Sequence, residues 1–180
     1  GKYSEEGQVG CSFCPPGKLC PIENGVGAGP ETTLANCPAG TWSDAVKGQS
    51  SCTDCSPGTH SAEAAGSCAD CPVGTNCTRS GVTTSEINDG TENCPAGTSS
   101  SAGVPGCQIC SAGKYSASGG PCEYCPAGAD CSDPENDGTP KDPYPLCEPG
   151  TYSPAAAKYC ESCPAGKQCA TDGTTDADIT

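Results

Sequence analysis

Apolar residues in this sequence are sparse and follow no long period. The candidate helical segments, residues 62–65 and 154–159, cover only about one turn each. Three-residue segments that follow a glycine, such as Thr41–Ser43 and Lys114–Ser116, predict short strands paired with residues beside the next cysteines. The pattern therefore predicts short β-ribbons and turns with little helix.

A repeat of cysteine and glycine is the strongest regularity of the chain. Nine cysteines are each followed by two residues and then a glycine. These glycines are Gly17, Gly40, Gly58, Gly74, Gly97, Gly113, Gly128, Gly150 and Gly166. Because glycine adopts a positive φ freely and a proline that presets φ precedes eight of the nine glycines, these sequences predict tight turns. We call the segment that such a cysteine opens a module and name it by that cysteine.

The chain contains two kinds of module. In a short module the turn glycine is followed by Thr or Lys, a variable residue and Ser, and a Cys-x-x-Cys closes the module. In a long module a cysteine stands in the Ser position and the first cysteine of the closing pair is absent. This order predicts a partial short repeat in 1–14 and long-short-short repeats in 15–71 and 72–125. A third repeat, 126–180, is long-short followed by a truncated long module.

The module frame predicts which cysteines pair. In short modules the opening cysteine should pair with the first cysteine of the next Cys-x-x-Cys, and in long modules with the cysteine in the Ser position. The short pairs are Cys37 with Cys52, Cys55 with Cys68, Cys94 with Cys107, Cys110 with Cys122, and Cys147 with Cys160. The long pairs are Cys14 with Cys20, Cys71 with Cys77, Cys125 with Cys131, and Cys163 with Cys169.

Cys11 is left over from this pairing. Gly1 occupies the glycine place of its module, so its opening cysteine is expected three residues upstream of Gly1. The sequence thus predicts a segment of a longer array, or a bond to a neighbouring molecule, with a free thiol as the remaining alternative.

Composition agrees with a fold held by disulfides. The 180 residues include 19 Cys, 25 Gly and 18 Pro but one Trp, one Phe and no Met, so no conventional hydrophobic core is expected. Disulfide scaffolds of this kind form in oxidising compartments, which predicts an extracellular or cell-surface location. Because every predicted bond is local, we expect an elongated rod of tandem modules in which each module contacts only its neighbours.

Charge and hydropathy exclude two classes of partner. The formal net charge is −14, from 22 acidic and 8 basic residues, and a nucleic acid would be repelled by it. No stretch approaches the roughly 20 apolar residues that would span a bilayer, so no membrane span is expected in this segment.

The variable residue of the short modules carries a ring in most cases. In order, the position holds Tyr3, Trp42, His60, Ser99, Tyr115 and Tyr152. Aromatic side chains supply much of the buried area in a module without a core, so these rings are expected to cover the disulfides. The alternative interpretation is an exposed strip that binds a partner.

Little in the sequence indicates catalysis or a bound metal. A single histidine and disulfide-bonded cysteines provide no catalytic group, and the Cys-x-x-Cys pairs, which resemble zinc or redox motifs, fit local pairing instead. We therefore expect neither an enzyme nor a cofactor. Calcium is the one candidate ligand, at Asp133, Glu135 and Asp137, where a solvated turn is the competing interpretation.

Asn76-Cys77-Thr78 is the one N-glycosylation sequon of the chain, and it makes Asn76 a candidate glycan site. It lies in a long module. Its middle residue is a cysteine of a predicted pair, so glycan addition would have to precede or accompany disulfide closure.

The frame Cys-Pro-Ala-Gly-Thr-x-Ser followed by Cys-x-x-Cys, as in Cys37–Cys55 and Cys94–Cys110, resembles the ephrin-receptor-like cysteine-rich repeat. It is also similar to the single-disulfide modules of tumour necrosis factor receptors. The resemblance covers essentially the whole chain and implies extracellular rods of modules that each close one local disulfide. Such repeats occur in receptor ectodomains, in ciliate surface antigens and in mastigoneme-type filaments of protists.

These observations predict an extracellular structural repeat protein that forms or spaces a glycosylated surface coat, fibre or filament and associates with itself. The alternative is a receptor or adhesion ectodomain that binds a protein ligand through one face. The long modules depart from the receptor pattern, so the resemblance carries over no ligand-binding residue.

Overall fold

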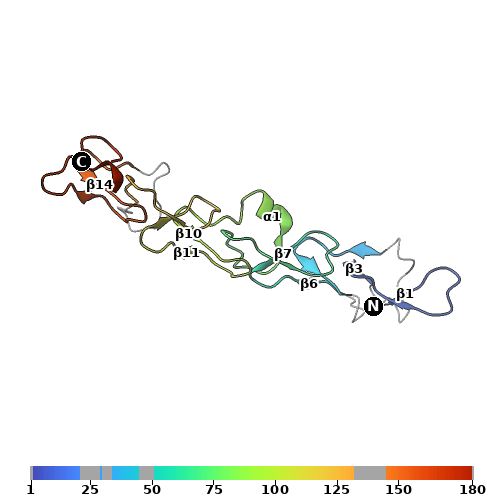
Figure 1. Ribbon diagram of the computed structural model, residues 1–180. Coiled ribbons are helices and arrows are strands. Elements are labelled where there is room, and N and C mark those ends of the chain that lie inside the picture. The colour runs from blue at the N-terminus through green and yellow to red at the C-terminus, as the bar shows by residue number, and fades with distance from the viewer. Residues whose placement is uncertain (1, 21–28, 30–33, 45–50, 132–144, 180) are drawn as a thin grey trace. The chain divides into compact units, whose positions relative to one another are not determined.

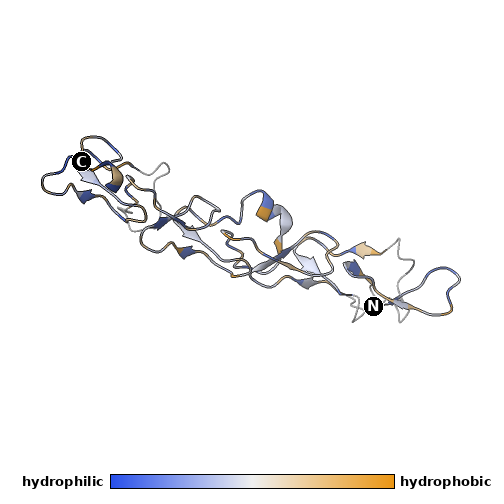
Figure 2. Cartoon of the chain, viewed as in Figure 1, coloured by the Kyte–Doolittle hydropathy of each residue, from blue (hydrophilic) through white to orange (hydrophobic). Residues whose placement is uncertain are grey.

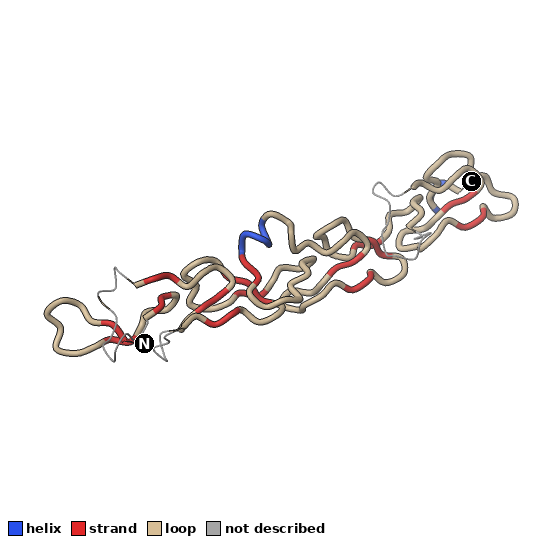
Figure 3. The backbone as a smooth tube through the Cα atoms, turned by 180° about the vertical axis from the view of Figure 1, so that it is seen from behind, coloured by secondary structure: helices blue, strands red, loops and turns tan. Residues whose placement is uncertain are grey.

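The computed structural model describes residues 2–20, 29, 34–44, 51–131 and 145–179. Most of this described chain is loop and turn, with short strands and little helix (Figures 1 and 3). The strands there form six two-stranded sheets and one three-stranded sheet. The fold is thus of the small disulfide-rich class with little helix, as the sequence predicts.

The first of two compact units comprises Gly1–Pro72, Asn76–Glu92 and Ala102–Gly106. Its elements are β1 (Lys2–Tyr3), β2 (Ser12–Phe13), β3 (Lys18–Leu19), β4 (Ala35–Asn36), β5 (Thr41–Trp42), β6 (Thr53–Asp54), β7 (Thr59–Ser61), β8 (Ala69–Asp70), β9 (Val82–Thr83) and α1 (Thr84–Asn88). β1 pairs with β2, β3 with β4, and β5 with β6, all antiparallel. β7 pairs with β8 antiparallel and with β9 parallel.

The second compact unit comprises Val73–Thr75, Asn93–Ser101 and Cys107–Thr180. Its elements are β10 (Thr98–Ser99), β11 (Gln108–Ile109), β12 (Lys114–Tyr115), β13 (Glu123–Tyr124), β14 (Thr151–Tyr152), β15 (Glu161–Ser162) and the 3₁₀ turn η2 (Asp176–Asp178). Each strand that follows a turn glycine pairs antiparallel with the strand before the next opening cysteine. The sequence predicts this pairing, because the disulfide holds both ends of the ribbon.

Nine disulfides hold these ribbons together. They are Cys14–Cys20, Cys37–Cys52, Cys55–Cys68, Cys71–Cys77, Cys94–Cys107, Cys110–Cys122, Cys125–Cys131, Cys147–Cys160 and Cys163–Cys169. They are the same nine pairs that the module frame gives. The paired cysteines are 12 to 15 residues apart in short modules and 6 apart in long ones. Cys11 is exposed and has no disulfide partner.

Cysteines take the place of a hydrophobic core. Among the described residues, Leu34, Val82 and Ala129 are the buried apolar side chains that are not cysteine. Each packs with the disulfide of a different long module. Figure 2 accordingly shows small, scattered hydrophobic segments along the ribbon.

Helical structure lies elsewhere than the sequence indicates. Residues 62–65 and 154–159 form turns, because Ala64 (φ 59°) and Ala156 (φ 65°) adopt the left-handed conformation that a right-handed helix cannot contain. Among the described residues the α-helix is α1, which begins with a capping box. The Thr83 hydroxyl accepts a hydrogen bond from the Glu86 backbone N–H, and the Glu86 carboxylate accepts one from the Thr83 backbone N–H.

Candidate functional site: the junction between successive modules

The turn glycine of one module is hydrogen-bonded to the next module. The Gly40 N–H donates to the Ser61 carbonyl at 3.1 Å, and the Gly97 N–H donates to the Ser116 carbonyl at 2.9 Å. Gly17, Gly74 and Gly128 donate in the same way to the carbonyls of Ser43, Ser100 and Ser153. Where the next module is long, a cysteine carbonyl accepts instead, as in Gly58 to Cys77 at 2.7 Å. The junction therefore uses the backbone of the Ser position whichever side chain stands there.

The recurring serine makes a second bond across the same junction. Ser116 is 1% exposed, and its hydroxyl donates to the Thr98 carbonyl of the preceding module at 2.7 Å. The hydroxyls of Ser43, Ser61, Ser100 and Ser153 likewise donate to the carbonyls of Lys18, Thr41, Thr75 and Ala129. A buried hydroxyl needs a partner, and the carbonyl of the preceding module supplies it. This hydrogen bond explains why serine recurs at this position.

The junction reaches a third module as well. A Cβ built on Gly113 would collide with the Ala156 carbonyl oxygen, which lies two modules further along the chain. The Ala156 N–H donates at 2.7 Å to the carbonyl of Cys125, in the module between. The expectation that modules contact only their nearest neighbours is therefore wrong. The disulfides are local, but a glycine without a Cβ lets two backbones approach each other closely.

The rings of the short modules are half-buried and not freely exposed. Tyr3 packs against the cluster that contains the Cys14–Cys20 disulfide, and Tyr115 against the cluster that contains Cys125–Cys131. Nδ1 of His60 lies 3.0 Å from the Thr84 hydroxyl. These contacts favour packing over a free binding strip at these positions.

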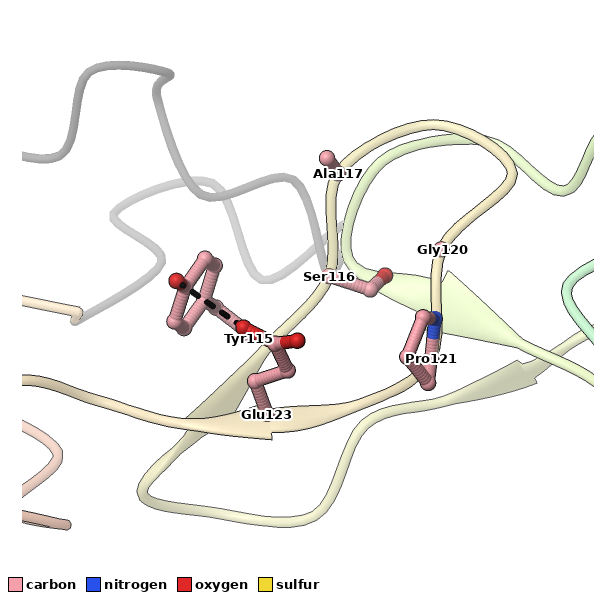
Figure 4. A pocket seen from close by; sticks show the side chains of 6 residues that line it. All are labelled: Tyr115, Ser116, Ala117, Gly120, Pro121 and Glu123. Atoms are coloured by element: carbon pink, nitrogen blue, oxygen red, sulfur yellow. Dashed lines mark hydrogen bonds between the residues drawn. The ribbon is translucent and has the colours of Figure 1, made fainter.

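A shallow hollow adjoins one of these rings (Figure 4). Its volume is about 120 Å³, and it is lined by Tyr115, Ser116, Ala117, Gly120, Pro121 and Glu123. The Tyr115 hydroxyl donates to the Glu123 carboxylate at 3.5 Å, and Tyr152 and Glu161 make the same contact. Ligand pockets usually measure about 300–1,000 Å³. The hollow is thus a feature of the ribbon surface and not a ligand pocket.

Acidic side chains form no metal site in the part of the chain that the structure describes, where no group of three or more His, Cys, Asp or Glu could hold an ion. The calcium candidates Asp133, Glu135 and Asp137 lie outside the described residues.

One ion-pair cluster lies beside α1. Arg79 contacts the carboxylates of both Glu86 and Glu92, the latter at 3.0 Å. Hydrogen bonds from the backbone and hydroxyl of Thr83, together with Arg79, lower the pKa of Glu86. Thr91 donates two hydrogen bonds to Asp89 and lowers the pKa of that carboxyl.

The sequon lies at the junction of a long module. Asn76 is partly buried, Cys77 is fully buried in its disulfide with Cys71, and Thr78 is exposed. The Asn76 N–H donates to the Glu92 carbonyl at 2.6 Å. The structure thus fixes the backbone of the candidate glycan site on both sides of its asparagine.

Two features were not predicted from the sequence: the helix α1 and the close approach of Gly113 to Ala156. The capping box Thr83-x-x-Glu86 was a readable signal for α1. The contact between Gly113 and Ala156 had no such signal, because it involves the backbone of Ala156 and therefore requires no particular side chain there.

No protein-family model matches the sequence, and no curated protein matches it. Within the described ranges, no helix is long and apolar enough to cross a membrane. The class that the fold defines is a small disulfide-rich protein with short antiparallel ribbons and a repeated junction between modules.

Proposed function

We propose that this chain is an extracellular structural repeat protein that forms or spaces a glycosylated surface coat, fibre or filament. The observation that carries the proposal is the recurrence of one junction, in which a turn glycine donates to the Ser-position carbonyl of the next module. When every repeat makes the same interface, the free energy of unfolding is a sum of similar contributions from repeats and interfaces. Further repeats can then be added without a new type of contact. That property suits a spacer.

The disulfides support the proposed location. Nine of them in 180 residues would be reduced in a cytosol and persist in an oxidising compartment. The net charge of −14 favours solubility of such a protein before it is assembled.

A role without catalysis is part of the proposal. The single histidine, His60, is half-buried and within hydrogen-bond distance of Thr84, and 18 of the 19 cysteines are in disulfides. Catalysis needs a nucleophile or base together with an orienting group, and a chain with one histidine and one free cysteine offers few residues for such a set.

Immunoelectron microscopy tests the proposal. An antibody raised against the chain should label a continuous coat or filament on the cells that secrete the protein, and pre-absorption with the chain should remove the label. Material released from those cells should sediment as assemblies larger than a monomer. A strictly monomeric released protein, with label dispersed in the medium, contradicts the proposal.

A receptor or adhesion ectodomain is the second candidate, and three exposed side chains favour it. Ile109, Tyr124 and Leu146 each precede an opening cysteine and are 67%, 67% and 54% exposed. We call them the apolar row. At the equivalent place the first compact unit has one exposed apolar residue, Phe13, and the polar residues Asn36, Asp54 and Asp70. Exposed apolar side chains at repeated positions suit a protein partner.

Beads coated with the protein test this candidate in a cell-adhesion assay. Replacing the apolar row by serine should abolish adhesion, while Asp54→Ser with Asp70→Ser should leave it unchanged. Amide exchange of the junction hydrogen bonds should be the same in all variants. Equal adhesion of both variants contradicts the ectodomain role.

A further inference from the structure

The sequon Asn76-Cys77-Thr78 and the Cys71–Cys77 disulfide share one residue, Cys77. We propose that Asn76 accepts an N-linked glycan only while Cys71 and Cys77 are unpaired, so that glycan addition and disulfide closure compete. The inference rests on the secretory route that the proposed function implies. It names the modification site of the glycosylated protein and what controls its occupancy.

In the folded module the sequon is held on both sides. Cys77, its middle residue, is 0% exposed and bonded to Cys71. The Cys77 carbonyl accepts the Gly58 N–H at 2.7 Å, and the Asn76 N–H donates to the Glu92 carbonyl at 2.6 Å. Beyond the sequon, the Thr78 methyl group lies near Gly106, 3.6 Å from the place of a Cβ there.

These bonds oppose modification after folding. A glycosyltransferase must bind the asparagine carboxamide and the threonine hydroxyl together in its own active site. The segment would have to leave its junction to do so, and the bond between Cys71 and Cys77, which are only 6 positions apart, prevents it. Once that bond has formed, Asn76 is no longer a substrate.

The fold nevertheless has room for a glycan attached earlier. Asn76 is only partly buried and Thr78 is exposed. The hydrogen bonds of this segment involve the Asn76 backbone, whereas the glycan is joined to its side chain. A module that was glycosylated first can therefore still close its disulfide and make its junction.

Each reaction consumes one group of the sequon, the Asn76 amide in glycan transfer and the Cys77 thiol in closure. In glycan transfer, Asn76 Nδ2 forms a bond to C1 of the first sugar of a lipid-diphosphate-linked oligosaccharide, the C1–O bond to the lipid diphosphate breaks, and the amide loses a proton. In closure, the Cys71 and Cys77 thiols lose two protons and two electrons to form the Sγ–Sγ bond. A disulfide-bearing oxidant of the secretory compartment is reduced to two thiols.

The timescales leave room for competition. Closing a loop of about 10 residues takes on the order of 10–100 ns, whereas disulfide formation takes seconds to hours, depending on the oxidant. The two cysteines therefore meet as soon as the sequon has been made but remain thiols until an oxidant reacts. During that interval Asn76 is accessible, so partial occupancy is expected.

The decisive variant is Cys71→Ser, which keeps Asn76-Cys77-Thr78 unchanged but cannot form the disulfide to Cys77. Its matched control is Cys125→Ser, which opens a disulfide of the same 6-residue separation in another long module. The full chain is produced in a eukaryotic secretory host, and the glycosylated fraction is read from intact mass before and after enzymatic deglycosylation. Cells and medium are both sampled, so that a retained variant is still counted.

The expected result is partial glycosylation of the wild type, a higher fraction in Cys71→Ser, a wild-type fraction in Cys125→Ser and none in Thr78→Ala. A brief pulse of reducing agent during synthesis should raise the wild-type fraction as well. Full glycosylation of the wild type, or equal fractions in Cys71→Ser and Cys125→Ser, would overturn the inference. Neither result bears on coat labelling, so failure here and failure of the proposed function remain distinguishable.

Discussion

Short and long modules build the same junction from different side chains. In the short Cys110 module, the buried Ser116 hydroxyl donates to the preceding module while its carbonyl accepts the Gly97 N–H. In the long Cys71 module, the Cys77 carbonyl accepts the Gly58 N–H in the same way, but the Cys77 sulfur is bonded to Cys71. The long module thus exchanges a hydrogen bond between modules for a covalent bond within one.

This exchange frees the rest of the long module. Its two cysteines are only 6 positions apart, so the following loop carries no cysteine that must return to the opening one. In the Cys14 module, Leu34 stands where short modules place that cysteine, and it packs against the disulfide cluster. In the Cys71 module the loop contains β9 and α1. The two kinds of module thus keep the same backbone hydrogen bond at the junction, while the length and secondary structure of the following loop vary.

The largest expected effect comes from adding a methyl group at the turn glycine. Gly113→Ala should cost about 2–5 kcal/mol, because left-handed alanine costs about 1–2 kcal/mol and overpacking typically adds 1–3 kcal/mol. Gly150→Ala is the matched control: its φ is +90° against +78°, and among the described residues no atom lies within 4 Å of the added Cβ. It should cost about 1–2 kcal/mol.

Amide hydrogen exchange of the Ala156 N–H measures the first effect, because this bond to Cys125 lies at the contact. Equal loss of protection in the two glycine variants would show that the third module does not depend on the close approach. The junction would then be limited to adjacent modules in short and long types alike.

Deleting one disulfide of each kind should have a smaller, graded effect. In the chain-entropy model each bond contributes about 2–3 kcal/mol, and the longer loop contributes about 0.6 kcal/mol more. Replacing Cys110 and Cys122, which are 12 residues apart, by alanine should thus destabilise more than replacing Cys125 and Cys131, 6 apart. Local exchange free energies in each module provide the measurement. The reverse order would mean that packing against Tyr115, and not loop closure, dominates in long modules.

Removing the bond specific to short modules should cost less again. Ser116→Ala leaves the Thr98 carbonyl without its hydroxyl donor, at a cost of about 0.5–1.5 kcal/mol. The exposed Ser111→Ala is the control and should change nothing measurable. Exchange of the Gly97 N–H, which is bonded to the Ser116 carbonyl, reports the loss. Unchanged exchange would indicate that the serine recurs for its small size and not for its hydroxyl.

The cysteine frame made much of this architecture predictable. Each pair is local and is fixed by its place in the module, so pairing and short ribbons such as β5 with β6 follow from spacing. The junction is different, because its bonds join backbone atoms that every residue type carries. Serine at position 116 is visible in the sequence, but its partner, the Thr98 carbonyl, carries no mark of its role.

The left-handed residues show the same limit. Gly128 and Gly113 each approach the backbone of a residue with a positive φ. At Gly128 this residue is Gly173, whereas at Gly113 it is Ala156, and alanine rarely adopts a positive φ. Tertiary contacts, and not local preference, hold that alanine in place. α1 was missed for a different reason: its five residues are too few for an apolar period, although its capping box is present in the sequence.

The smallest expected effect is a local titration in the long Cys71 module, where α1 has no counterpart among the described residues of the short modules. The hydrogen bonds from Thr83 and the contact with Arg79 place the pKa of Glu86 below its ordinary value when the loop is folded. A carboxyl whose pKa is lowered by folding stabilises the fold above its unfolded pKa, and this contribution is lost as the pH falls through the folded pKa. The Thr83–Glu86 capping box should therefore open in acid while the disulfide-bonded ribbons remain intact.

Carboxyl chemical shifts followed by NMR should show Glu86 titrating below an ordinary glutamate, and Thr83→Ala should raise the pKa of Glu86 toward the ordinary value. If Glu86 titrates identically in wild type and Thr83→Ala, the capping box does not hold this loop, and the loop's structure must come from the packing of Val82 and Ile87 on the Cys71–Cys77 disulfide.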